Sequence, residues 1–275
     1  MNGTTQRWCV WSGTVMIVGW IGGFWLLANF LPPPSPNLSA REIADLYLGH
    51  ATAIRWGLIV TVTGCAFLGP FVVAIYNQMR RIEGRNSPLA LVQLMLGAVL
   101  VLEFCAPVVV MQVCTFRADR NPEIIQALND VAWLVFLGLV STAVLEVLTV
   151  GIAILRDHRA EPIMPRWLGY LSLWTATTWT PGTVTVFFKT GPLAWNGLFV
   201  WWVPLTAFAL WLIGLTRCML VAIAKQEQRG DAVAEDAWEL DIDRRVEALR
   251  RELAELQTAR RDVPAAAART AETAR

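Results

Sequence analysis

Two glutamates lie inside long apolar stretches and are the first candidates for chemistry. Glu103 belongs to residues 88–114 and Glu146 to residues 131–155. A charge within hydrocarbon costs about 3 kcal/mol or more unless it faces a partner or water, so such residues are candidate site residues. Helical rise places them about 9 Å apart in depth. They indicate a proton or cation pathway or a polar anchor for a substrate; alternatively, each is protonated and hydrogen-bonded to backbone or threonine.

Hydroxyl and indole groups gather in residues 166–188, which contain Thr175, Thr178, Trp179 and Pro181. Pro181 removes a backbone hydrogen bond and kinks a helix. Irregular backbone is tolerated in a bilayer where it is buried in protein or lines a wet cavity. The segment is expected either to line a pocket or to pack internally, with its threonines bonded back to their own helix. Prolines in three further apolar stretches also favour an irregular bundle with a cavity: Pro70, Pro107 and Pro204.

A polar turn between the last two apolar stretches contains Lys189, Trp195 and Asn196. Lys189 could pair with Asp130 or Asp119 at the outer mouth of a cavity, with Trp195 and Asn196 shaping the rim. Alternatively, the lysine extends to lipid headgroups while its stem stays in apolar surroundings.

These residues need membrane-spanning helices to position them. Hydrophobic residues make up 55% of the 275 and charged residues 16%. A spanning helix requires about 20 apolar residues. Arginines in alternate loops place both termini in the cytoplasm and residues 32–52, 115–130 and 189–197 outside. The predicted fold is all-α and polytopic, with six transmembrane helices near residues 9–31, 53–76, 88–114, 131–155, 166–188 and 198–224.

The first outer loop predicts a short helix of its own. A polyproline stretch begins at Pro32 and leads to Ser39, followed three residues later by Glu42, which is a capping-box pattern. The next residues give one apolar face, which includes Tyr47. We expect this helix to rest on the outer membrane interface, where tyrosine is favoured.

Composition excludes several classes of function. The five cysteines form no C-x-x-C pair, and the two histidines, His50 and His158, are far apart. A haem, zinc or di-iron site would therefore lack ligands, and no cofactor or metal is expected. A net charge of +1 gives no sign of a nucleic-acid partner, so membrane lipids are the expected surroundings.

Beyond the predicted transmembrane domain of residues 1–225, the sequence becomes charged. An apolar seam at heptad spacing predicts a cytoplasmic helix over residues 236–261, followed by a disordered tail over residues 262–275. The helix could be a short coiled coil that joins protomers, or an amphipathic helix that packs on the membrane domain or on a partner subunit. The seam consists of Ile242, Val246, Leu249, Leu253 and Leu256.

Two outer segments resemble a known group of proteins. They are F-F-K-T-G-P-x-A-W-N-G at residues 187–197 and F-R-x-D-R-x-P-E followed by L-N-D-x-x-W within residues 116–133. Both resemble segments of an uncharacterised family of bacterial six-helix membrane proteins from actinomycetes. The resemblance implies this fold over residues 1–224 and a place in the bacterial cytoplasmic (inner) membrane, and it implies no activity.

Three functions remain open, because the sequence contains no phosphate-binding loop, nucleophile elbow or zincin helix. The first is a non-enzymatic protein, oligomeric or part of a complex, that binds or passes a small apolar or amphipathic molecule in a bundle cavity. The second is a channel or proton-coupled carrier that uses Glu103 and Glu146. The third is a membrane enzyme that acts on lipid or isoprenoid substrates with a glutamate as the acid.

Overall fold

The computed structural model describes residues 3–230, 244–250 and 253, and in these residues the regular secondary structure is helical. Contacts divide the chain into two units. One comprises Asn2–Ala224, and the other comprises Lys225–Arg275 together with Met1.

Five helical stretches of the described residues are long and apolar enough to cross a membrane. They confirm the prediction of an all-helical, multi-pass membrane protein. The stretches are Gly3–Leu27, Ala51–Glu83, Pro88–Phe116, Pro122–Leu155 and Leu198–Gln228.

The predicted span over residues 166–188 is helical but is not among these five. It consists of α8 (Arg166–Trp179) and a 3-10 helix, η2 (Thr180–Phe187). Its threonines and tryptophans are less apolar than the aliphatic residues of the other stretches, which lowers its hydropathy. The count of six spans and the orientation of the termini therefore stay predictions.

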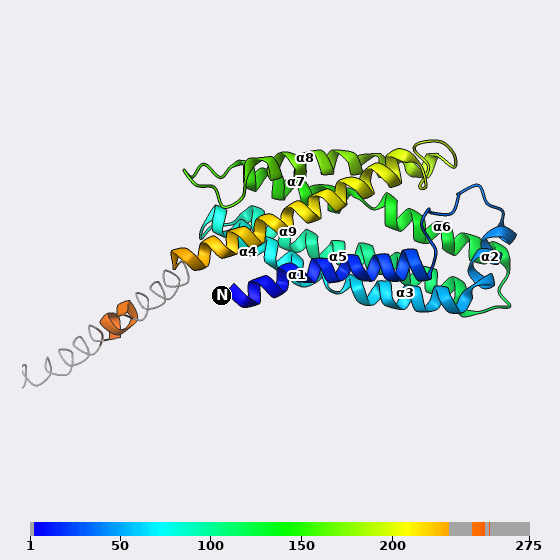
Figure 1. Ribbon diagram of the computed structural model, residues 1–275, viewed down its shortest axis with the longest axis horizontal. Helices are drawn as coiled ribbons and strands as arrows, with labels where there is room; N and C mark the ends of the chain where they lie inside the picture. Colours follow the sequence, from blue (N-terminus) through cyan, green and yellow to red (C-terminus); the bar gives the residue numbers. More distant parts are fainter. Residues whose placement is uncertain (1–2, 231–243, 251–252, 254–275) are drawn as a thin grey trace, which may run out of the picture. The chain divides into compact units, whose positions relative to one another are not determined.

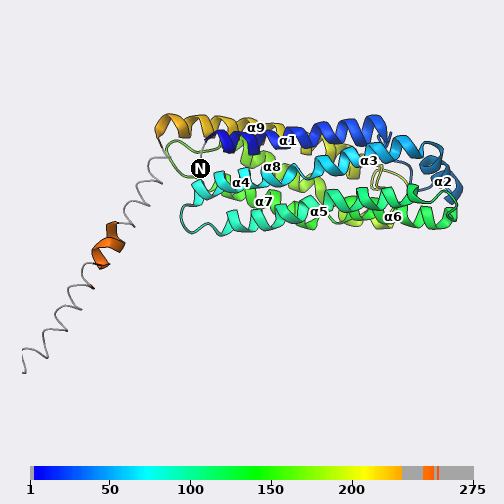
Figure 2. The same cartoon turned by 90° about the horizontal axis from the view of Figure 1, so that it is seen from below.

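In the first unit, all helices except α2 run side by side, and α2 lies across one end of them near the start of α6 (Figures 1 and 2). Two of the predicted spans are divided, at Ala66–Phe67 and at Leu139–Val140. The bounds are α1 Gly3–Gly19, η1 Trp20–Leu27, α2 Ala40–Gly49, α3 Ala51–Cys65, α4 Leu68–Glu83, α5 Pro88–Phe116, α6 Pro122–Gly138, α7 Ser141–Leu155, η3 Leu198–Trp202 and α9 Val203–Arg229.

The capping box that begins α2 is present as predicted. The backbone N–H of Ser39 donates to Glu42 Oε2 at 2.7 Å, and the N–H of Glu42 donates to Ser39 Oγ at 3.4 Å. Hydrogen bonds from the Ser39 hydroxyl and backbone lower the pKa of Glu42. At the same end of the bundle, the hydroxyl of buried Tyr47 donates to Asn129 Oδ1 on α6 at 3.1 Å. Local capping and this long-range bond together fix α2 against the bundle.

Close backbone contact fixes η1 against α3. A Cβ built on Gly23 would lie 2.4 Å from both the carbonyl oxygen of Gly57 and the hydroxyl oxygen of Thr61. A Cβ on Gly57 would lie 2.5 Å from the carbonyl oxygen of Gly23. Small residues allow such approach between membrane helices. Gly23 thus packs directly on α3, and in the same interface the indole N–H of Trp20 donates to Cys65 Sγ on α3 at 3.2 Å.

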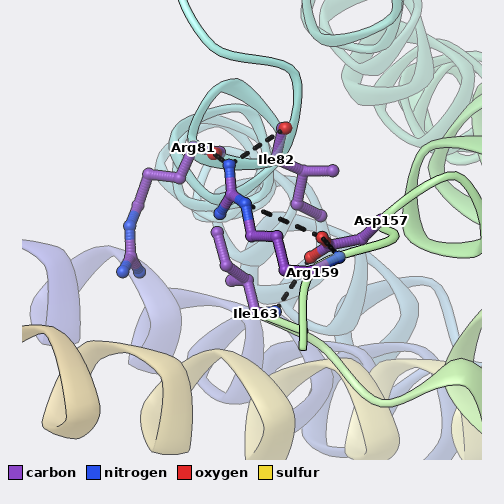
Figure 3. A network of polar contacts seen from close by, with 5 residues as sticks. All are labelled: Arg81, Ile82, Asp157, Arg159 and Ile163. Carbon is purple, nitrogen blue, oxygen red and sulfur yellow. Dashed lines mark hydrogen bonds and ion pairs between the residues drawn. The ribbon is translucent and has the colours of Figure 1, made fainter. Parts of the chain in front are cut away.

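The end opposite α2 is held by a polar network around Arg159 (Figure 3). The Arg159 guanidinium donates to the carbonyl oxygens of Arg81 and, at 3.2 Å, Ile82 near the end of α4. Helix ends leave such carbonyls without helical partners, so the guanidinium satisfies them. Buried Asp157 accepts from the N–H groups of Arg159 at 3.3 Å and Ile163 at 2.9 Å. These bonds fasten the loop between α7 and α8 to α4.

Candidate functional site

A cavity of about 410 Å³ lies between η1, α5, the junction of α6 and α7, η2, η3 and α9. Its lining is almost entirely apolar. Glu103 is the one residue with an ionisable side chain among the described residues that line it. Eight aromatic residues line it: Trp20, Phe24, Trp25, Phe104, Phe136, Trp179, Trp201 and Phe208.

Irregular backbone concentrates around this cavity. The π-helices η1 and η3 and the 3-10 helix η2 all contribute lining residues, and so does Val140 at the break between α6 and α7. Segments of π-helix are frequent at functional sites. Non-helical backbone at membrane depth is tolerated where it is buried in protein or lines a cavity. The π-helices, the 3-10 helix and the break between α6 and α7 thus all adjoin the cavity, whereas the break at Ala66–Phe67 does not.

Proline and glycine account for part of this irregularity. Pro107 has no N–H for the carbonyl of Glu103, four residues earlier, and Pro204 has none for the carbonyl of Val200. A Cβ on Gly182 would lie only 2.3 Å from the carbonyl oxygen of Leu137, so η2 can approach the end of α6 this closely only with glycine there. Of these six residues, all but Pro107 line the cavity.

Glu103 is positioned by a hydrogen bond from α7. The Thr142 hydroxyl donates to Glu103 Oε1, and the glutamate side chain is 7% exposed. Thr142 precedes Glu146 by four residues, which is about 6 Å along the helix. The polar groups of α5 and α7 thus meet at the edge of the cavity.

Glu146 lies behind this contact and is fully buried. Gln93 Nε2 donates to Glu146 Oε1 at 3.0 Å. Glu146 Oε2 and Gln93 Oε1 have no hydrogen-bond partner among the residues that the structure describes. Glu146 and Glu103 are within electrostatic range of each other. The two predicted glutamates therefore lie on helices that pack together, with only Glu103 lining the cavity.

The predicted residues near the end of α8 are placed differently from one another. Trp179 lines the cavity, and its indole N–H donates to the carbonyl oxygen of Pro204 at 3.3 Å. Thr178 donates to the Thr175 carbonyl at 2.7 Å, and Pro181 begins η2. Thr175 is buried, and its hydroxyl has no partner among the described residues. Thr175, Thr178 and Pro181 do not line the cavity.

The predicted outer-mouth residues lie away from the cavity lining. Trp195 is buried, and its indole N–H donates to the carbonyl oxygen of Pro34 at 2.7 Å, so it anchors the polyproline stretch. Asn196 is partly buried and Lys189 is exposed. Lys189 is within electrostatic range of Asp130, and no ion pair joins the two in the described part of the chain. Their role at a mouth stays a prediction.

Apart from Trp179, the aromatic lining residues were not predicted from the sequence. Trp20 and Phe24 are one turn apart in the first span, and such spacing is as common in helices that only pack. Their rings meet Phe136 from α6 at centroid distances of 5.3 and 6.5 Å. Trp201 from η3 also contacts Phe136, and its indole N–H has no partner in the described residues. This assembly of rings depends on segments far apart in the chain.

The C-terminal seam is only partly described. Ile242 and Leu256 lie outside the described residues. Val246, Leu249 and Leu253 are described and exposed, which leaves an association through this helix as a prediction.

Comparison with known proteins assigns no function. No family model, no curated protein and no solved structure matches the chain. The resemblance of the two outer segments to a bacterial membrane-protein family therefore stays an expectation. In its described residues the chain is all-helical, and its long apolar helices are those of a multi-pass membrane protein.

Proposed function

We propose that this chain is a non-enzymatic membrane protein that binds or passes a small, mainly apolar molecule in the cavity beside Glu103. This proposal rests on the cavity, whose described lining is mostly aromatic and aliphatic and contains a single carboxyl group. Ligand pockets typically measure about 300–1,000 Å³ and combine apolar walls with a few polar groups. The cavity of about 410 Å³ falls in this range.

The position of the cavity supports access from the bilayer. Ile21, Trp25 and Leu205 line it and are also 44%, 46% and 39% exposed, respectively. The lining therefore reaches the surface between η1 and α9, where the exposed residues are apolar. A molecule dissolved in lipid could enter there without passing charged groups.

Leu205 and Leu210 on α9 offer a matched test. Both are exposed leucines, but only Leu205 lines the cavity. A neutral aromatic molecule with a photoactivatable diazirine should label residues of η1 and α9, as mapped by peptide mass spectrometry in lipid nanodiscs. Leu205→Trp should reduce this labelling at least about tenfold, whereas Leu210→Trp should leave it unchanged. Equal labelling in both variants would contradict binding in the cavity.

We propose that residues 166–187 form a sixth span. α8 has 14 residues and η2 has 8, which together extend about 37 Å at the rises of α- and 3-10 helices. This length exceeds the hydrocarbon thickness of about 30 Å. α8 also packs beside α7, a membrane-spanning helix (Figure 1).

We also propose that the chain lies in a bacterial inner membrane with both termini in the cytoplasm; an even number of spans and the arginine distribution support termini on that side. Ala160 and Thr190 are exposed and flank the span. In a variant without native cysteines, Ala160→Cys and Thr190→Cys should react with an impermeant thiol reagent from opposite sides of vesicles. Reaction of both from the same side would refute the sixth span.

The exposed leucines of the C-terminal helix support assembly into a homo-oligomer or with a partner subunit. Light scattering in detergent should show fewer protomers per particle after deletion of residues 236–275. An unchanged number of protomers would remove this proposal.

A proton-coupled carrier is a second candidate, favoured by one observation. Glu146 is fully buried, has an oxygen without a partner, and lies within electrostatic range of Glu103 at the cavity. A proton could pass between the two carboxyl groups through water and reach a bound ligand through Glu103, which lines the cavity. Proton flux into liposomes should fall in Glu103→Gln and in Glu146→Gln, and unchanged flux in both would contradict this candidate.

A further inference from the structure

The charge distribution around the cavity bears on the kind of molecule that it holds. Glu103 contributes the one ionisable side chain of the described lining, and lysine, arginine and histidine are absent from that lining. Glu146, on α7, which packs against α5, lies within electrostatic range of Glu103 and is also acidic. The acidic groups at this site thus have no basic residue among the described lining residues to balance them.

A carboxylate in such surroundings is costly without a partner of opposite charge. The Thr142 hydroxyl gives Glu103 one hydrogen bond, which orients the carboxyl group without neutralising it. A positively charged ligand would supply the missing countercharge, whereas a negatively charged ligand would be repelled. A neutral ligand would gain only from burial of its apolar surface.

The aromatic rings add a second attraction for positive charge. Trp20 meets Phe104 edge-on at 5.4 Å and stacks on Phe136 at 5.3 Å. Phe208 lies 5.8 Å from Phe104 and 5.7 Å from Trp179. These rings form a continuous group beside Glu103. The faces of aromatic rings attract cations, most strongly where water is excluded.

We infer that the cavity beside Glu103 takes a lipophilic cation, such as an aromatic or alkyl quaternary ammonium, with its charge against Glu103 and its apolar groups among the rings. This inference rests on the proposed function, because it requires that the cavity is a binding site. It adds the charge class of the ligand, which the cavity alone leaves open.

A pair of ligands of equal shape tests the inference. Biphenylmethyl-trimethylammonium and its neutral isostere, in which carbon replaces nitrogen, differ only in charge. Binding is measured by equilibrium dialysis of the full chain in nanodiscs of zwitterionic lipid, with empty nanodiscs subtracted. Wild type should bind the cation at least about tenfold more tightly than the isostere, a difference of about 1.4 kcal/mol.

Variants of Glu103 separate charge from shape. Glu103→Gln keeps an acceptor for Thr142 and should bind both ligands with similar affinity, while Glu103→Asp should keep the preference for the cation. A preference that persists in Glu103→Gln, or a wild type that binds both ligands equally, would overturn the inference while leaving the binding site intact. A wild type that binds neither ligand would overturn the proposed function as well.

Should Glu103→Gln fail to fold, Leu205→Trp gives a second measurement. It leaves the carboxyl group in place and should weaken binding of both ligands by the same factor, because the larger indole takes up volume in the cavity that they share. Loss of isostere binding alone would contradict a common site for the two ligands.

Discussion

Replacing Gly23 with alanine should separate η1 from α3 and so disturb the cavity, because η1 forms part of its wall. The added Cβ would lie 2.4 Å from the carbonyl oxygen of Gly57 and from the hydroxyl oxygen of Thr61. Ordinary contact requires about 3.5 Å, so the two helices would have to move apart by about 1 Å. Overpacking of this kind costs about 1–3 kcal/mol. The shift also displaces Trp20 and Phe24, which line the cavity.

Gly22 provides the matched control, because a Cβ there would meet nothing within 4 Å. Gly22→Ala should be neutral or stabilising by up to about 1 kcal/mol, since alanine is the better helix former. Thermal unfolding in detergent, followed by circular dichroism, should rank the proteins Gly22→Ala, wild type, Gly23→Ala from most to least stable. Gly23→Ala should also bind the neutral isostere more weakly. Equal stability of the two variants would refute the packing of η1 on α3 described here.

Two further predictions concern the ends of the bundle. Arg159→Ala should leave carbonyls at the end of α4 unsatisfied and speed proteolysis in the loop between α7 and α8. The free energy of unfolding should fall by about 0.5–1 kcal/mol, a modest loss because the arginine is half-exposed. Arg156 is a nearby exposed arginine, and Arg156→Ala should change neither quantity. Ser39→Ala should raise the pKa of Glu42 toward its ordinary value, because the serine hydrogen bonds lower it. Any stability that Glu42 contributes is present above its unfolded pKa and is lost as pH falls through its folded pKa; carbon-13 chemical shifts of labelled glutamate report this titration, and an unchanged pKa would contradict the role of Ser39.

Local spacing rules account for what the sequence predicted well. The apolar stretches of about 20 residues gave most of the membrane helices, because the bilayer sets their length. The capping box at Ser39 and Glu42 was also predictable, since both partners lie within one helical turn. The segment over residues 166–188 is ambiguous for a physical reason: it is long enough to span, but its hydroxyl-bearing residues lower its hydropathy.

The site depends on packing between distant segments and could be predicted only in part. The intramembrane position of Glu103 singled it out, yet its partner Thr142 is 39 residues away. The cavity needs Trp20, Phe136 and Phe208 to meet from three different helices. No pattern within any one of those helices distinguishes a ring that lines a cavity from a ring that fills a core.

Proline positions were an incomplete guide to irregular backbone. Pro70 follows the division at Ala66–Phe67, and Pro107 lies within the continuous helix α5. The division at Leu139–Val140 has no proline nearby, and it adjoins the place where Gly182 contacts the carbonyl of Leu137. That break therefore coincides with a contact between distant segments, which local sequence does not reveal.

The central claim is that the cavity holds a mainly apolar molecule beside Glu103. The most direct test is a structure by electron cryomicroscopy of the full chain in lipid nanodiscs, with a bound antibody fragment and a saturating amount of biphenylmethyl-trimethylammonium. We predict density for the ligand among Trp20, Phe104 and Phe208, with its ammonium group next to the Glu103 carboxyl. A cavity closed by its own side chains, or ligand density only at the lipid-facing surface, would contradict the claim.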